Sequence, residues 1–128
     1  MSILTEEQAR AILDKVIKLS KADQCTAQLT GNIDGNIRFA LNDISTSGIV
    51  DDTDLAVEVA FGNKVGVATI NEFDDASLER VVRRAEDLAR LAPENPEFMP
   101  AIEKQTYKPS PTFTQSIADI TPEYRAQV

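Results

Sequence analysis

Residues 55–69 read Leu-Ala-Val-Glu-Val-Ala-Phe-Gly-Asn-Lys-Val-Gly-Val-Ala-Thr, and this stretch decides the fold. Apolar side chains occupy the odd positions from 55 to 61, which is the period of a half-buried strand. Gly62-Asn63 then supplies the two residues of a tight hairpin turn. We expect Val65, Val67 and Thr69 to return along the same face as the first strand. The stretch therefore predicts an antiparallel β-hairpin.

The sequence before this hairpin alternates in the same way. Residues 25–29 predict a further strand, with apolar side chains at odd positions. Residues 31–35 contain an Asp-Gly pair that is typical of a turn, and another strand is expected over residues 37–41. After Asn42-Asp43 the apolar positions change parity, which indicates either a β-bulge or a tight turn. These patterns predict a mainly antiparallel sheet of four or five strands.

Two amphipathic helices are predicted on either side of the strands. The first, over about residues 5–20, opens with Thr5 and has Gln8 three residues later, which is a capping box. The second, over about residues 75–92, places an apolar stripe opposite a charged face. Because both helices are amphipathic and the strands alternate, we expect both helices to pack on one face of the sheet. The predicted fold class is α+β.

Glycine and proline divide the chain, since all five glycines lie between residues 31 and 66 and all six prolines lie from Pro93 onward. We therefore expect an α+β domain over residues 1–92 and an extended Pro-rich arm over residues 93–128. The arm is expected to pack on its own domain as far as about Tyr107. Thr121-Pro122-Glu123 is typical of a helix start. A helix that starts so near the last residue favours an arm that leads into a missing C-terminal region of a longer protein.

Composition limits the function classes. A chain of 128 residues is the size of one domain, and its net charge of −8 argues against a nucleic-acid partner. The chain has no histidine and one cysteine, Cys25, which we interpret as a small core residue. We therefore expect no catalytic residue, no metal ligand and no cofactor in this chain. With no apolar run long enough to span a membrane and no signal-like N-terminus, we expect a cytoplasmic protein without a membrane partner.

Three strings in the chain resemble one known family. Residues 38–44, Arg-Phe-Ala-Leu-Asn-Asp-Ile, resemble the RFA-x-N strand of the TldD/PmbA family, and residues 66–74 resemble its G-x-A-x-T/S-N strand running into the second helix. Residues 84–98 resemble the end of that helix and the P-E-N/D-P-E-F linker. The resemblance implies the N-terminal domain of a protein related to zinc metallopeptidases and their partner subunits, once described as modulators of DNA gyrase. It also implies a homo- or heterodimer with a family partner subunit.

The family's metal motif, HExxxH, lies well beyond the N-terminal domain. Because this chain has no histidine, none of the motif can be placed on its residues, and zinc is expected only in the missing part of the parent protein. The reading frame after Val128 would test this expectation, because an HExxxH string there would give the class of the parent.

The candidate binding residues are polar. We expect Arg38, Asn42 and Asn71 to contact a peptide substrate or a partner subunit, although a solvated strand face with a bulge explains the first two more simply. The acids Asp51, Asp52 and Asp54 are expected in one solvated loop, because they lack the spacing of a calcium-binding loop.

The leading hypothesis is a non-catalytic N-terminal domain that contributes to a subunit interface or to a peptide-substrate chamber in proteolysis or peptide maturation. The alternative is a free-standing protein-interaction module that docks through its C-terminal arm. A gyrase or nucleic-acid modulator would need its acidic groups stacked along one face to mimic DNA, whereas here they are interleaved with basic groups.

Overall fold

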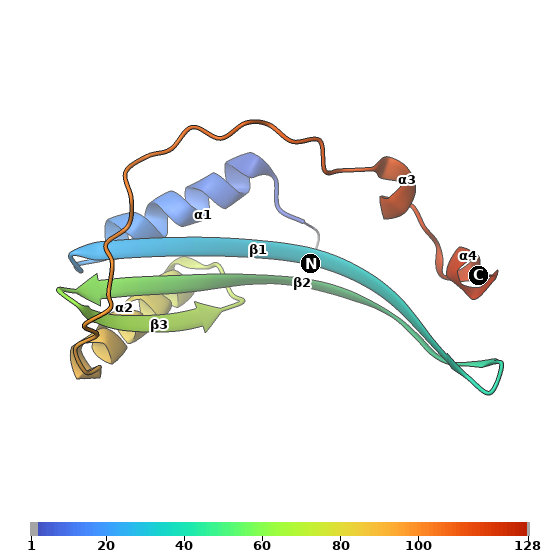
Figure 1. The fold of residues 1–128 in the computed structure, drawn as a ribbon, viewed down its shortest axis with the longest axis horizontal. Helices are drawn as coiled ribbons and strands as arrows, with labels where there is room; N and C mark the ends of the chain where they lie inside the picture. Colours follow the sequence, from blue (N-terminus) through green and yellow to red (C-terminus); the bar gives the residue numbers. More distant parts are fainter. Residues whose placement is uncertain (1–2, 128) are drawn as a thin grey trace.

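The computed structural model describes residues 3–127 and confirms the α+β class (Figure 1). Its sheet has three antiparallel strands in the order β1-β2-β3, so the expected number of four or five is wrong. The elements follow in the order α1 (Glu6–Leu19), β1 (Gln24–Ala40), β2 (Asp43–Phe61), β3 (Lys64–Ile70), α2 (Asp75–Leu91), α3 (Gln115–Ala118) and α4 (Pro122–Gln127).

The strand count is lower because β1 runs straight through the predicted turn at residues 31–35. Gly31 pairs with Thr53 and Gly35 pairs with Ile49, so the ladder continues without a break. The local turn preference of the Asp-Gly pair is overridden because β2, with 19 residues, is long enough to pair with β1 beyond this point. For the same reason Asp51, Asp52 and Asp54 lie within β2, and the expectation that they form a loop is wrong.

The change of parity after Asn42-Asp43 predicted either a tight turn or a β-bulge, and the hairpin between β1 and β2 contains both. Leu41 and Asn42 form the turn with positive φ values of 54° and 61°, as a tight two-residue hairpin requires. The register then shifts between Arg38 and Phe39, which leaves Ser45 as the extra residue of a bulge in β2. The Ser45 hydroxyl donates a hydrogen bond to the Arg38 carbonyl at 3.1 Å.

The hairpin between β2 and β3 forms where it was predicted, but the face of β3 is different. Val59 pairs with Gly66, so Val65 and Val67 lie on the face opposite to the buried side of β2, and their expected placement is wrong. A two-residue turn joins odd positions to even ones, which places the small residues of β3 on the inner side. A Cβ atom at Gly66 would come within 3 Å of the backbone of Ala85 and Ala89, so glycine allows α2 to lie directly on β3.

Both predicted helices form, and both cover the same face of the sheet. Thr5 and Gln8 make the expected capping box of α1, and the carboxylate of Asp74 accepts hydrogen bonds from the first turn of α2. We call the covered face the inner face. Each fully buried Val or Leu contributes about 1.5–3 kcal/mol to folding. The buried hydrophobic cluster joins both helices to the sheet and comprises Val16, Leu55, Val57, Val59, Ala68, Leu78, Val81, Val82, Ala85 and Ala89.

A buried carboxylate ties the end of α1 to α2. Glu86 is 1% exposed and accepts hydrogen bonds from the Lys21 backbone N–H at 2.6 Å and from Arg83 at 2.7 Å. Arg83 also donates to the Leu19 carbonyl at 2.9 Å, which satisfies the last turn of α1. Burial raises the pKa of Glu86, but the Lys21 N–H and the guanidinium groups of Arg83 and Arg90 outweigh it and lower the pKa.

The C-terminal arm touches the rest of the chain at two places. Near its start, the Asn95 N–H donates to the Asn63 carbonyl at 3.0 Å, and the Ala101 N–H donates to the Gln24 side chain at 2.9 Å. Its last part forms α3 and α4, which lie beside the far end of the long hairpin (Figure 1). The helix start predicted at Thr121 is confirmed, since its hydroxyl accepts from the Tyr124 N–H at 3.2 Å.

Candidate functional site

The β1–β2 hairpin extends beyond β3 and projects from the helix-covered part of the molecule (Figure 1). We call residues 31–53 the ribbon, and we call α1, α2, β3 and residues 24–30 and 54–61 of the long strands the body. The ribbon keeps the register of the body, so Ile33, Ile37 and Ile49 lie on the continuation of the inner face. In contrast to the body, Ile33 is 52% and Ile49 is 60% exposed. Exposed apolar side chains gathered on one surface are typical of an interaction site.

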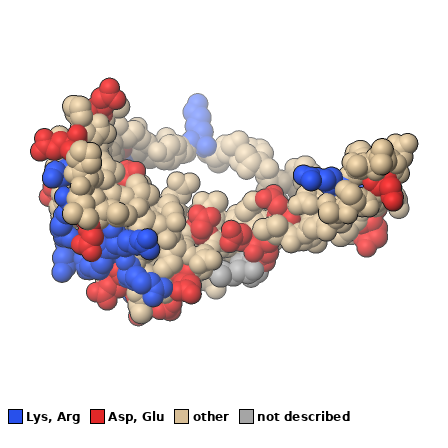
Figure 2. All heavy atoms as spheres, turned by 90° about the horizontal axis from the view of Figure 1, so that it is seen from below, with Lys and Arg blue, Asp and Glu red and all other residues tan. Residues whose placement is uncertain are grey.

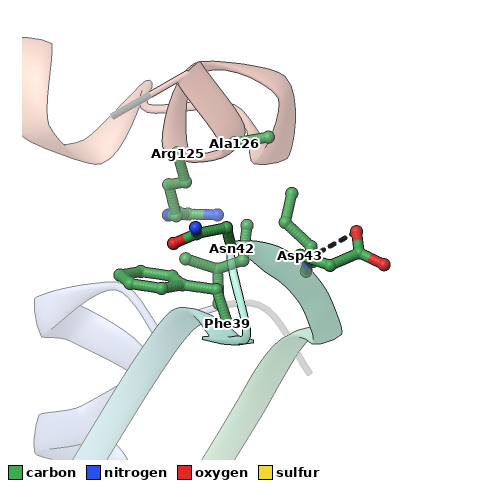
Figure 3. Close-up of a pocket in the computed structure, with 7 residues that line it drawn as sticks. Phe39, Asn42, Asp43, Arg125 and Ala126 are labelled. Atoms are coloured by element: carbon green, nitrogen blue, oxygen red, sulfur yellow. Dashed lines mark hydrogen bonds between the residues drawn. The ribbon is translucent and has the colours of Figure 1, made fainter.

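A pocket of about 270 Å³ lies between the tip of the ribbon and α4 (Figure 3). Its polar groups are the side chains of Asn42 and Asp43 from the ribbon and of Arg125 from α4. Two further pockets, of about 340 Å³ and 370 Å³, follow along the same face. The apolar lining of the first pocket comes from Ile37, Phe39, Ile44 and Ala126.

Arg125 is the polar centre of this contact. Its side chain reaches from α4 toward Asn42 and Phe39 on the ribbon (Figure 3), and its guanidinium lies against the backbone of Gly35, where a Cβ atom would clash with it. One nitrogen, Nη2, donates to the Ile120 carbonyl at 3.0 Å. Among residues 3–127, the buried Nη1 has no hydrogen-bond partner. A buried, charged donor without an acceptor destabilises the contact that buries it.

The charges of the molecule are unevenly distributed. Residues 31–54 contain five aspartates and a single basic residue, Arg38. Figure 2 shows acidic groups along the ribbon and basic groups gathered over the body. Many basic groups of the body are paired within it, as Arg80 is with Glu72 at 2.8 Å. Of these five aspartates only Asp51 shares the inner face with Ile33 and Ile49, so this stretch is mainly apolar on one face and acidic on the other.

The three predicted binding residues do not form one site. Arg38 is exposed on the side of β1 opposite to Ile37, and Asn42 occupies the turn and lines the pocket at the tip. Asn71 follows β3 directly, beside the position where Ile70 pairs with Leu55. From the tip to Leu55 the chain covers twelve residues of β2, which corresponds to roughly 40 Å of strand. The geometry brings Asn42 to the candidate site and leaves Asn71 far from it.

The residues that build this surface were not among the predicted binding residues. Ile33 was assigned to a turn and Ile49 to no strand, because the predicted turn at residues 31–35 broke the alternating pattern. The signal that could have found them is the odd-numbered row at 29, 33 and 37, which keeps the phase of the preceding strand. No local signal marks Arg125, since its role depends on α4 meeting a distant strand.

Neither a metal-binding cluster nor an activated thiol is found among residues 3–127. Within residues 3–127, no group of three or more His, Cys, Asp or Glu side chains is placed to hold a metal ion. The donor set of a zinc site therefore does not fit this chain. Cys25 is half-buried against the core, and burial raises the pKa of its thiol, so the reactive thiolate is disfavoured. None of the described helices has both the length and the apolar character needed to cross a bilayer.

Comparison with known proteins gives a family and a fold. Residues 29–89 match the model of the family described as PmbA/TldA metallopeptidase domain 1. The crystal structure of TldE from Thermococcus kodakarensis is similar over 90% of this chain, with a TM-score of 0.75 and 14% sequence identity. This chain spans 26% of the length of that protein. No curated protein matches the sequence significantly.

Proposed function

Because this chain is an N-terminal domain of the TldD/PmbA family, we propose that it is a non-catalytic domain of a metallopeptidase-family protein and that its ribbon forms part of a subunit interface. The partner is a second subunit of the same family, in a homo- or heterodimer. The observation that carries this proposal is the apolar inner face of the ribbon, which continues the core-facing side of the sheet beyond the two helices that cover it.

The exposed residues of the ribbon support an interface over a purely structural role. Phe39 is 70% exposed, and Leu41 is fully exposed at the tip of the hairpin. Aromatic and large aliphatic side chains anchor protein interfaces, where they lose contact with water on binding. A two-stranded ribbon has little stability of its own in water, so a second surface that covers it would also stabilise it.

In this proposal the zinc ion and the groups that cleave a peptide bond come from another part of the whole protein. The described residues offer no donor set for the metal, and the sequence has no histidine. The domain then acts by positioning a partner subunit and not by chemistry.

A contribution to the substrate chamber is the second candidate, because two strand edges are free for pairing. In the described sheet β1 and β3 are the edge strands, and the backbone groups on their outer sides can pair with an extended peptide. Main-chain hydrogen bonds would supply the affinity, so this candidate fits a peptidase that accepts several sequences. The candidate is tested by adding a peptide substrate to the assembled complex and following the β3 amides.

The interface is tested by assembling the chain with the family subunit that carries the zinc motif in the same organism. Light scattering after size-exclusion chromatography measures the mass of the complex. We expect Phe39→Ser with Ile49→Ser to abolish the complex, whereas Val67→Ser, an exposed apolar residue on the outer face of the body, should leave it intact. A complex that tolerates the double substitution in the ribbon would disprove the proposed interface.

A further inference from the structure

The last part of the C-terminal arm, residues 115–127, lies on the inner face of the ribbon (Figure 1). We call it the seated segment. Its Ile117 lines a pocket together with Ile33 of the ribbon, and its Arg125 lies against the backbone of Gly35. The structure therefore shows one sequence that the inner face of the ribbon accepts, and this sequence belongs to the chain itself.

The seated segment is held by contacts that any copy of the same sequence can make. Within residues 3–127, the hydrogen bonds of residues 102–127 all stay inside the arm, and no ion pair joins these residues to the body or the ribbon. What remains is apolar contact and the Arg125 guanidinium against Gly35. These contacts are the same whether the segment comes from its own chain or from another.

The residues that link the segment to the body, 102–114, are extended when the segment lies on its own ribbon. We call them the tether. Ala101 donates to the Gln24 side chain, and Ile33 lies nine residues further along β1, which is roughly 30 Å of strand. A relaxed chain from residue 102 to residue 116 spans only roughly 20 Å. Stretching a tether beyond its relaxed length lowers the effective concentration of the segment at its own ribbon.

The tether gains nothing in return for its extension. Every residue from 102 to 114 is exposed. Pro109 and Pro111 keep this stretch from folding into a helix or a strand of its own. A segment on such a tether can move to a second molecule without losing a hydrogen bond to its own body.

The segment also leaves much of the inner face uncovered. Phe39 and Ile49 are 70% and 60% exposed although the segment lies over them, and Ile117 and Tyr124 are mostly exposed as well. Pockets of about 270, 340 and 370 Å³ remain along the contact. Monomeric proteins rarely leave a continuous apolar surface in water. A second copy of the chain would bring both a second ribbon and a second segment to this surface.

We propose that residues 115–127 lie on the ribbon of a second copy of this chain, so that two copies exchange their arms in a dimer with two-fold symmetry. Exchange of an identical element keeps the contacts that the structure shows and closes after two copies. This proposal deepens the proposed function and rests on it, because the ribbon is the same interface and the partner is now a second copy.

The first test is the mass of the wild-type chain, measured by light scattering after size-exclusion chromatography at increasing concentration. A tethered segment competes at an effective concentration in the millimolar range at most, so dimers should form below about 1 mM. A chain that stays monomeric up to about 1 mM would overturn the proposal.

Two substitutions distinguish exchanged arms from any other dimer. Ile37→Glu places a carboxylate in the ribbon's half of the contact, and Ile120→Glu places one in the segment. Burying a charge in an apolar contact removes that contact, so each variant alone should dimerise at least about 100-fold more weakly than the wild type. In an equal mixture, each mixed dimer keeps one undamaged ribbon facing one undamaged segment. The mixture should therefore dimerise at least about 10-fold more tightly than either variant alone.

Matched variants control for the added charge. Val50→Glu lies on the outer face of the ribbon, and Ile102→Glu lies at the start of the tether, where the side chain is exposed. Both should leave the dimer unchanged. Thermal unfolding of all four variants shows that the body is still folded, since none of these residues belongs to the buried core.

Two results from these variants would overturn the exchange. A mixture that dimerises no better than its components would show that each arm stays on its own ribbon, and equal losses from Ile37→Glu and Val50→Glu would exclude the inner face. Either result leaves the proposed function standing if Phe39→Ser with Ile49→Ser still abolishes the complex with the zinc-motif subunit. Restored dimers, together with a zinc-motif complex that tolerates that double substitution, would keep the exchange and refute the interface with that subunit.

Discussion

The body and the ribbon are built from the same two strands, yet they end in opposite environments. In the body, Leu29 pairs with Leu55 under the helices, and Leu55 is completely buried. Six residues earlier on the same strand and the same face, Ile49 is 60% exposed. The alternation of apolar residues is continuous across both parts, so it reports where a strand runs and which side is apolar. What covers that side is decided by elements elsewhere in the chain or in a partner.

Because α1 and α2 cover the body and not the ribbon, we expect local stability to differ along the ladder that β1 and β2 form. Core packing against α1 and α2 stabilises the body, whereas a bare two-stranded ribbon is marginal in water. The substitutions below compare matched positions in the two parts.

The largest expected difference is between Leu55→Ala in the body and Ile49→Ala in the ribbon. Truncating a buried leucine removes apolar burial and leaves a cavity, which lowers the free energy of unfolding by about 2–5 kcal/mol. Ile49 is mostly exposed, so its truncation should cost less than about 1 kcal/mol. Urea denaturation followed by circular dichroism measures both values. Equal losses would show that the ribbon is as well packed as the body.

Two glycines give the next comparison. Gly66→Ala would place a methyl group within 3 Å of the α2 backbone at Ala85, and such overpacking costs about 1–3 kcal/mol. Gly48→Ala would place its methyl group 3.5 Å from the Asn36 side chain, an ordinary contact, and should change the stability by less than about 0.5 kcal/mol. A shift of the thermal midpoint for Gly48→Ala as large as that for Gly66→Ala would contradict the account.

The buried carboxylate of the body offers a smaller effect. Glu86→Gln keeps the size of the side chain but removes the charge that Arg83 and the Lys21 N–H contact, and should cost about 1–2 kcal/mol. Asp87→Asn removes an exposed partner of Arg90 at 3.0 Å and should cost less than about 0.5 kcal/mol. If both substitutions cost the same, Glu86 does not tie α1 to α2 as described.

The dependence of stability on pH should come mainly from the body. The pKa of Glu86 lies below its ordinary value of 4.5, and hydrogen bonds from the Ser77 side chain and backbone lower the pKa of Asp74 below 3.8. Groups with lowered pKa stabilise the fold above their unfolded pKa, and this contribution is lost as the pH falls through the folded value. Thermal midpoints should therefore fall below about pH 4.5, less steeply in Glu86→Gln. An identical acid slope in that variant would refute the assignment.

The sequence predicts the body well because its signals are local. Thr5 with Gln8 at the first helix and Gly62-Asn63 between two strands each mark a boundary through contacts within a few residues, and both are confirmed. The prediction of which β3 side chains face the core was wrong. That face depends on the two-residue turn, which joins odd positions of β2 to even positions of β3, and on the close approach of α2 to Gly66. That approach is a tertiary contact, which no short pattern encodes.

The ribbon was poorly predicted for a related reason. The Asp34-Gly35 pair is typical of a turn, but pairing of Gly35 with Ile49 across a long ladder outweighs that local preference. Of the candidate site, Asn42 was expected at a binding surface and lines the pocket at the tip, although its role in binding stays a prediction. Arg125 could not be found, because its contact with Gly35 joins residues ninety positions apart.

The central claim is that the ribbon extends, beyond the cover of α1 and α2, a ladder whose other half is the core. Native-state hydrogen exchange on the wild-type chain tests it most directly, because β1 and β2 provide amide probes along their whole length. We predict that the amides of residues 54–60 exchange only through global unfolding. The paired amides of residues 31–53 should exchange through openings that cost at least about 2 kcal/mol less. Uniform protection from Gln24 to Phe61 would contradict the account, since the ribbon would then be as stable as the body without a partner.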